Sequence, residues 1–457
     1  MEDSVQTALK KLRIHHETLT STTSNSQPLP FELVDHIFDL YIKTSSPHIG
    51  CPPRRDGKII SRDPGPLLLA SVCRVWRRRC LLRPALWSKL TVYSRKNAPK
   101  RDYELSTIVS IWLRRAQDHP LNLALHLNSV FTASVKTAAT VFAILPHLAK
   151  QIETLAITID RRTVDHFYRE ISFPMLKDFS LIIDEAQHED EDALHESALL
   201  DNLIAPQLTS ARLIHASTDW ITLPWSQITK FEAVYRELYE ISPLLEQMPL
   251  LQELDFTLRR SGFSSVYHQP DVAGRLIPMP ALRILRLHYA LPLIPRLTLP
   301  ALTTLEIENM EESDIGKLSL LAERSTWPLH ALFFERTSPA AIVAGLKVAP
   351  MLHTVGLDLR LGAGDKGPLV EEDVNEVFAI LGMPNHLPNL RSLRLISPPL
   401  SSIDSVAPAL QEHNQLELLD LSVVTVEGDV TDLSRALTLF QRPTLRLKLH
   451  SASKTPY

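Results

Sequence analysis

The sequence contains little cysteine and little glycine. Its three cysteines, Cys51, Cys73 and Cys80, are an odd number without a Cys-x-x-Cys pair, which argues against a disulfide framework or a zinc cluster and fits a reducing compartment. The 13 glycines among 457 residues are under half of the usual share of roughly 7%. So small a number argues against the glycine-rich loops of Rossmann-type nucleotide enzymes.

Long hydrophobic runs and an excess of one charge are also missing. The most apolar stretch, residues 141–148, is short and contains Pro146 and His147, and the first residues lack the basic-then-apolar order of a signal peptide. The 48 Lys and Arg residues nearly balance the 52 Asp and Glu residues, so no overall positive field attracts nucleic acid or an anionic membrane. We therefore expect a cytoplasmic and/or nuclear protein that binds neither nucleic acid nor a membrane.

Motifs of catalysis are missing as well. The sequence has no HExxH, GxSxG or GxxxxGK(S/T) motif, and residues 361–368 (LGAGDKGP) lack the Gly-Lys-Ser/Thr end that holds phosphate and magnesium. We interpret 361–368 as a turn-forming loop and the acidic run 184–192 as a solvated loop without calcium-ligand spacing. The histidines show no metal-ligand spacing. The sequence thus predicts no enzyme, no catalytic or metal-binding residue and no cofactor.

Proline is the residue in excess, and it introduces a repeated motif. The 33 prolines are about 7% of the chain, against roughly 5% on average. From residue 151 onward a Leu-x-x-Leu-x-Leu pattern, often preceded by proline as in MPALRILRL and LPNLRSLRL, returns about every 26 residues, a spacing typical of leucine-rich repeats. The copies have their first apolar positions at Ile152, Leu176, Leu208, Ile228, Leu251, Leu282, Leu302, Leu329, Leu352, Leu390 and Leu416.

This pattern predicts an α/β fold in which a solenoid of leucine-rich repeats forms most of the chain. In Leu-x-Leu the two leucines share one strand face, and only stacked copies bury that face, as a curved parallel sheet with helices or turns on its convex side. Residues 338–348 and 372–381 have helical patterns and are expected on that side. We divide the chain into a short helix and polar linker (1–28), a helical unit (29–90), a connecting region (91–150), the solenoid (151–450) and a tail (451–457).

The predicted helical unit contains two helical stretches and an insertion. Pro30 stands at a helix start, and the prolines of residues 44–66 indicate an irregular, solvent-facing insertion. Pro84 breaks the second stretch before Trp87. One apolar helical face before the insertion consists of Leu33, Ile37, Leu40 and Tyr41, and another after it of Leu69, Val72, Cys73 and Trp76.

The segments LPFELVDHIF, SVCRVWRRRC and PALW, in this order and followed by irregular leucine-rich repeats, resemble the F-box proteins of a fungal, basidiomycete-type family. The resemblance implies a substrate receptor of an SCF-type ubiquitin ligase, in which the F-box binds an adaptor protein and through it a cullin scaffold. The insertion departs from the family pattern and would impair adaptor binding if it displaced the first helix from the second. The family's adaptor-facing positions correspond to Leu29, Pro30, Leu33, Ile37, Phe38, Val72, Cys73 and Trp76, and its terminal anchor to Leu86 and Trp87.

The helical pattern alone leaves the role of these apolar residues open. Apolar stripes on helices are usually core, whereas the resemblance places Leu29, Pro30 and Phe38 on a docking surface and leaves Trp87 undecided. The arginines at 74 and 77–79, with the basic run 94–101, are interpreted as a solvated helix face that could also steer an acidic adaptor.

The residues between the two strand leucines are expected to form a central column on the concave face. The column has mixed charge and one aromatic residue, which suits a protein target better than nucleic acid, although ordinary solvated positions remain the alternative for each residue. Its members are Ala156, Ser180, Arg212, Glu232, Asp255, Arg286, Glu306, Phe333, Gly356, Arg394 and Asp420. The target-binding candidates among them are Asp255, Arg286, Glu306, Phe333, Arg394 and Asp420.

Together these patterns predict a non-enzymatic substrate receptor. Its helical unit is expected to bind the ligase adaptor, and its solenoid an unknown target protein. The alternative is a leucine-rich-repeat scaffold that retains an F-box-like fold without joining a ligase.

Overall fold

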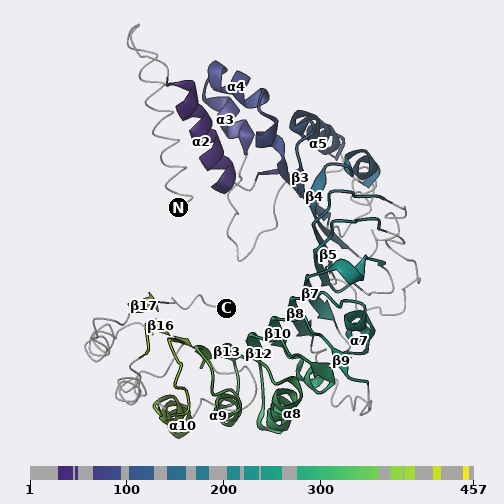
Figure 1. Ribbon diagram of the computed structural model, residues 1–457. Coiled ribbons are helices and arrows are strands. Elements are labelled where there is room, and N and C mark those ends of the chain that lie inside the picture. The colour runs from purple at the N-terminus through teal and green to yellow at the C-terminus, as the bar shows by residue number, and fades with distance from the viewer. Residues whose placement is uncertain are drawn as a thin grey trace. The chain divides into compact units, whose positions relative to one another are not determined.

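The computed structural model places the chain in two compact units, Met1–Pro224 and Trp225–Tyr457, each described here by itself (Figure 1). The residues that the structure describes are 29–44, 47–49, 65–93, 102–127, 142–160, 171–184, 203–216, 221–235, 238–259, 275–359, 371–383, 385–396, 415–423 and 446–451. The predicted first helix, the phosphate-loop-like segment 361–368, the basic run 94–101 and all but the first residue of the acidic run 184–192 lie outside them.

The first unit opens with three helices and a 3-10 turn: α2 (Phe31–Thr44), α3 (Pro66–Val72), α4 (Arg74–Leu81) and η1 (Pro84–Trp87). Prolines precede or begin three of them, because a fixed φ and a missing N–H are tolerated at a helix start. The second predicted helical stretch is broken at Cys73, whose extended backbone (φ −157°) ends α3 and whose Sγ accepts a hydrogen bond from the Trp76 N–H at 3.4 Å. The break before Trp87 is confirmed.

Aromatic side chains form the core of this helical part. Phe38 of α2 meets Trp76 of α4 edge-to-face, with ring centroids 5.3 Å apart. Trp87 packs in the same way on Trp112 of α5 (Asp102–Ala116), with a centroid distance of 4.9 Å. The Trp87 Nε1–H donates to the Cys80 carbonyl and the Trp112 Nε1–H to the Trp87 carbonyl, both at 3.0 Å, so neither buried indole nitrogen lacks an acceptor.

The sheet of the first unit is entirely parallel and follows chain order. Its strands are β1 (His48–Ile49), β2 (Lys89–Tyr93), β3 (Leu121–Leu127), β4 (Ile152–Asp160), β5 (Asp178–Asp184) and β6 (Ser210–Ile214). The ladder thus starts well before residue 151, with β1 and the first residues of β2 inside the expected helical unit and β3 inside the expected connecting region. β2 and β3 alternate buried and half-buried residues as later strands do, but they lack the Leu-x-x-Leu spacing that identifies the repeats.

The ends of the predicted insertion are anchored, which corrects the expectation that all of it faces solvent. β1 pairs with β2, and Pro47 is buried. Gly65, at φ +55°, lies so close to Pro47 that an added Cβ would sit 2.3 Å from the Pro47 Cβ. A positive φ and this close approach both favour glycine at that position.

The second unit repeats a parallel strand and a helix or turn. Its strands β7 (Lys230–Tyr235), β8 (Glu253–Leu258), β10 (Ile284–His288), β12 (Thr304–Glu308), β13 (Ala331–Glu335), β14 (Thr354–Asp358), β15 (Ser392–Ile396), β16 (Leu418–Val423) and β17 (Arg446–Ser451) pair in this order. A separate parallel pair joins β9 (Ile277–Pro278) to β11 (Leu297–Thr298).

The helices of the second unit lie on one side of its strands (Figure 1). They are α7 (Leu238–Glu246), α8 (Ile315–Ser325), α9 (Pro339–Val348) and α10 (Glu371–Leu381), with 3-10 turns η5 (Trp225–Gln227), η6 (Leu291–Arg296) and η7 (Glu312–Asp314). The helices predicted at 338–348 and 372–381 are confirmed as α9 and α10. The expectation of an α/β architecture built on a parallel sheet is met.

Proline recurs because it sits in the turn that leads into several of the strands. In Met279-Pro280-Ala281-Leu282 the Leu282 N–H donates to the Met279 carbonyl at 3.3 Å, which closes a turn with proline at its second position. The same bond closes the turns that end at Leu176, Leu208, Leu251, Leu302 and Leu390. All first apolar positions of the predicted copies are buried, with at most 3% of their surface exposed.

The buried strand positions predict a clear stability contrast. Leu305→Ala in β12 removes a fully buried side chain, which should lower the free energy of unfolding of its unit by about 2–5 kcal/mol. Leu320→Ala on α8 truncates a side chain that is 52% exposed and should change the free energy of unfolding by under about 0.5 kcal/mol. Urea unfolding followed by circular dichroism measures both, and equal shifts would contradict the assignment of the core.

Candidate functional site

Helix α2 carries two adjacent apolar stripes, and the described residues cover only one of them. Val34, Phe38 and Tyr41 face inward and are buried. The neighbouring positions point outward and, with the leucine that precedes the helix, form what we call the outer stripe: Leu29, Leu33, Ile37 and Leu40. Leu33 and Leu40 are 50% and 51% exposed, and Ile37 is half-buried. The single apolar face predicted for this helix is therefore split, with Tyr41 in the core and the rest outside.

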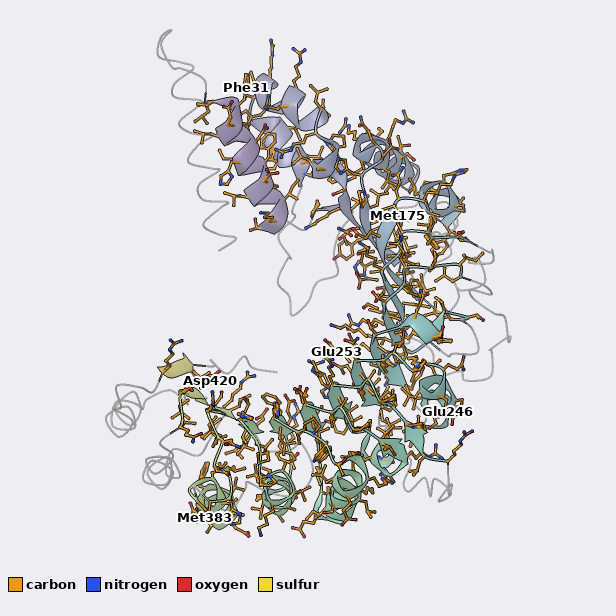
Figure 2. All side chains as sticks on the ribbon, viewed as in Figure 1. Phe31, Met175, Glu246, Glu253, Met383 and Asp420 are labelled. Carbon is orange, nitrogen blue, oxygen red and sulfur yellow. The ribbon has the colours of Figure 1, made fainter. Side chains whose placement is uncertain are left out.

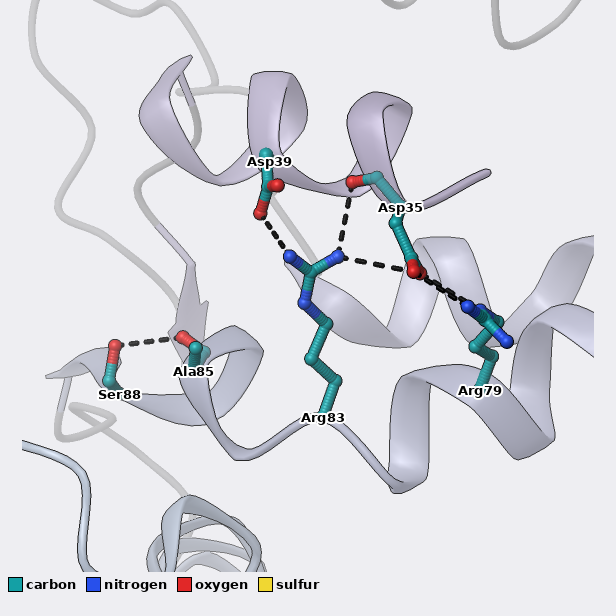
Figure 3. A network of polar contacts seen from close by, with 6 residues as sticks. All are labelled: Asp35, Asp39, Arg79, Arg83, Ala85 and Ser88. Atoms are coloured by element: carbon teal, nitrogen blue, oxygen red, sulfur yellow. Dashed lines mark hydrogen bonds and ion pairs between the residues drawn. The ribbon is translucent and has the colours of Figure 1, made fainter. Parts of the chain in front are cut away.

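The opposite flank of α2 is held to α4 by ion pairs (Figure 3). Arg79 donates from Nε and Nη2 to the two carboxylate oxygens of Asp35, at 2.9 and 2.6 Å. Arg83 bonds Asp39 through Nη2 at 2.6 Å and donates from Nη1 to the Asp35 carbonyl at 3.1 Å. The hydrogen bond from Arg79 lowers the pKa of Asp35, since it favours the charged carboxylate. The insertion therefore does not displace the first helix from the second.

The start of α2 is fastened by the same arginine. The Arg79 guanidinium lies 4.5 Å from the centroid of the Phe31 ring, in a cation–π contact. Arg79 is thus part of the helix packing, which corrects the view of the whole basic cluster as a solvated face. Arg74 and Arg78 are exposed and fit that view.

The structure divides the residues that the family resemblance assigned to the adaptor. Phe38, Trp76, Leu86 and Trp87 are buried in the core. Leu29, Pro30 and Leu33 are exposed, and Ile37, Val72 and Cys73 are half-buried. The family resemblance did not assign the other exposed apolar residues of this part of the chain, Phe31, Leu40, Leu67, Val75, Leu81 and Leu82. The helical pattern nevertheless predicted Leu40 on the same apolar face as Leu33.

The strands of the second unit have an open face, which consists of the side chains of β7–β16 that point away from the buried leucines. Figure 2 shows Glu253 and Asp420 on this side and Glu246 and Met383 on the helix side. The predicted central column is confirmed in register, running from Glu232 through Asp255, Arg286, Glu306, Phe333, Gly356 and Arg394 to Asp420. In the first unit, Ala156, Ser180 and Arg212 align in the same way.

A second column, missed by sequence reasoning, runs beside the first. It lies two residues further along each strand and contains His288, Glu308, Glu335 and Asp358 in register. The signal was present, since residues i and i+2 of a strand share a face. Only the alignment of neighbouring strands shows that these charges are adjacent.

Ion pairs connect the two columns. His288 bridges two carboxylates, with Nδ1 2.9 Å from Glu308 Oε2 and Nε2 3.4 Å from Asp255 Oδ1. Hydrogen bonds to Asp255 and Glu308 raise the pKa of His288 to about 9, so that this half-buried ring is a cation at neutral pH. Arg286 Nε lies 3.2 Å from Glu306 Oε2, and Arg336 Nη1 lies 3.4 Å from Glu308 Oε1.

Glu335 differs from its neighbours because the described part of the chain offers its carboxylate no hydrogen bond or ion pair. Burial raises its pKa, and the negative charges of Glu306, Asp358 and Glu308 raise it further. On the same strand, the Phe333 ring leans over Gly356, where an added Cβ would lie 2.2 Å from Phe333 Cδ1. Glycine at 356 thus lets the ring lie across β14.

Within the described ranges, no group of three or more His, Cys, Asp or Glu side chains is placed to hold a metal ion. No helix in that part of the chain is both long and apolar enough to cross a lipid bilayer. Comparison with protein families and with curated proteins finds no match to this chain.

The bridging position of His288 predicts a pH dependence of stability. A folded-state pKa of about 9, above the ordinary 6.5, means that the proton stabilises the fold below about pH 6.5 and that this contribution is lost as the pH rises through 9. The free energy of unfolding of wild type should therefore fall by on the order of 2 kcal/mol between pH 6.5 and 9.5. The His288→Gln variant lacks this titrating group and should not show that fall.

Urea unfolding at a series of pH values measures this difference. The matched control is His386→Gln, which changes an exposed histidine of the same unit and should follow wild type. If wild type and His288→Gln showed the same slope with pH, the bridge would not contribute to stability.

Proposed function

We propose that this protein is the substrate-recognition subunit of an SCF-type ubiquitin ligase in the cytoplasm and/or nucleus. In this proposal the helices α2–α4 and η1 form an F-box that binds the ligase adaptor, and through it a cullin scaffold. The parallel repeats form a leucine-rich solenoid whose open face holds a target protein. The observation that carries the proposal is the outer stripe of α2.

The outer stripe has the form of a helix that docks in a groove. Leu33, Ile37 and Leu40 follow the i, i+4, i+7 spacing of apolar anchors in helix-in-groove complexes. Exposing several large apolar side chains together on a short helix is unfavourable in water, and such patches mark interaction sites. Covering them with a partner removes that surface from water.

The docking helix is held in a defined orientation. The bidentate Arg79–Asp35 pair and the Phe38–Trp76 contact fix α2 from two sides without using the outer stripe. A helix that is already ordered loses less conformational entropy on binding, so more of the contact energy appears as affinity. Arg74 and Arg78 would attract an acidic adaptor.

Under this proposal the chain performs no chemistry of its own. Adaptor and target bind to different parts of the chain, and simultaneous binding raises the concentration of target lysines near a ubiquitin-conjugating enzyme. The mixed charges of the open face suit recognition of a protein, for which a few arginine and aromatic anchors supply most of the binding energy.

A scaffold without ligase function is the second candidate, and the burial of Phe38, Trp76, Leu86 and Trp87 favours it. These side chains cannot contribute to an adaptor interface while the helices stay folded. The outer stripe would then bind another helical partner.

Replacing the outer stripe separates the two candidates. Leu33→Glu together with Leu40→Glu should weaken binding of the purified adaptor by about a hundredfold, because charge replaces two central apolar anchors. Thermal stability should stay nearly unchanged, since both side chains are exposed. Calorimetric titration of the full-length protein with the adaptor measures the affinity.

The matched control is Leu250→Glu, which charges a similarly exposed leucine of the second unit and should bind as wild type does. No adaptor binding by folded wild type would refute the ligase proposal. Unchanged affinity of the double variant would refute the assignment of the outer stripe.

A further inference from the structure

We propose that the open face at β12, β13 and β14 binds a basic side chain, a lysine or an arginine, of the protein that this chain recognises. The inference rests on the proposed function only in calling that protein a ligase target. Its basis is the Phe333 ring with carboxylates at neighbouring positions of the open face.

The floor of this site is the ring of Phe333. In the central column Phe333 is flanked by Glu306 on β12 and by Gly356 on β14. The contact with Gly356 lays the ring across the neighbouring strand and leaves it half-buried rather than projecting. Such a ring presents apolar surface and π-electron density, on which the stem and head of a lysine or arginine pack favourably.

Carboxylates stand around this ring. Glu306 is one strand away, about 4.8 Å, and Glu335 is two residues along β13, about 6.8 Å. Glu308 and Asp358 occupy the positions beside Glu335 on the adjacent strands. These spacings are within the span of one guanidinium or ammonium group that sits over the ring and touches a carboxylate.

Charge complementarity selects a cation as the occupant. On this part of the face the described carboxylates are Asp255, Glu306, Glu308, Glu335 and Asp358, and the described cations are Arg286, His288 and Arg336. Each of these cations already contacts Glu306, Glu308 or Asp255, and none is within ion-pair distance of Glu335. Burial raises the pKa of Glu335, and the charges of Glu306, Asp358 and Glu308 raise it further; a cation bound beside it would favour the charged carboxylate.

The neighbouring strands limit the site. On β15 the exposed Arg394 lies beyond Gly356 in the central column and repels a second positive group. On β10 the Arg286–Glu306 pair closes the other side. The site therefore accommodates one basic side chain rather than a long polybasic segment.

The test measures the retention of full-length protein by immobilised peptide pools. The peptides of each pool have eleven residues. The central residue is fixed as Lys, Arg, Leu or Glu, and the other positions are degenerate. We expect the Lys and Arg pools to retain at least about fivefold more protein than the Leu and Glu pools, because a cation–π contact and a charge-assisted contact form together. Equal retention by the Leu or Glu pools would overturn the proposal.

Variants assign the retention to this site. Glu335→Gln and Phe333→Ala should each abolish most of the preference for Lys and Arg. Glu323→Gln makes the same charge change on the exposed side of α8 and should leave the preference intact. Glu335→Gln is nearly isosteric and is expected to fold, so it tests the proposal even if Phe333→Ala does not fold. A preference that persists in folded Glu335→Gln would overturn the site.

Adaptor binding, measured on the same preparation, distinguishes the two proposals. The double variant of the outer stripe should lose the adaptor and keep the peptide preference. A peptide preference without adaptor binding by wild type would refute only the ligase assignment. Adaptor binding without a peptide preference would refute only the site for a basic side chain.

Discussion

The burial of one apolar strand face in each repeat is the constraint on which the rest of the structure depends. A single Leu-x-Leu strand has no partner for its leucines, so each repeat is stable only when its neighbours lie alongside it. Parallel pairing in register follows, and a proline turn leads into several of the strands. The same constraint aligns the outward residues into columns. They form the open face because they alternate with the buried leucines and point to the other side of the sheet.

In the helical part, too, apolar surface has to be buried, and part of it stays exposed. Its core is filled by the Phe38–Trp76 and Trp87–Trp112 pairs, and α2 has more apolar surface than that core can cover. The ion pairs of Asp35 and Asp39 then decide which stripe faces inward, because they hold the opposite flank of α2 against α4. The outer stripe stays exposed among the described residues. In the second unit the uncovered feature is electrostatic, a half-buried Glu335 without a described cation.

Much of this follows from spacing in the sequence. The repeat positions, the helices at 338–348 and 372–381, the break at Pro84 and the register of the central column depend on local periodicity and on turn chemistry, which neighbouring residues determine. The early strands β2 and β3 and the anchoring of Pro47 were not predicted, because they depend on pairing between distant segments without the repeat motif. The helical pattern left open whether Phe38 is core, because its place on α2 does not tell which stripe meets Trp76.

The sequence by itself determined the kind of element, the buried leucines and the residues that alternate with them, since side-chain direction along a strand has a period of two. Only the tertiary structure decided that Leu33 is exposed while Phe38 is covered, and that His288, Glu308, Glu335 and Asp358 stand side by side. The reason is physical: burial and charge proximity are properties of surfaces brought together from distant segments. The spacing of the repeats predicts which residues share a strand face, whereas burial and ion pairs depend on how the strands lie against one another.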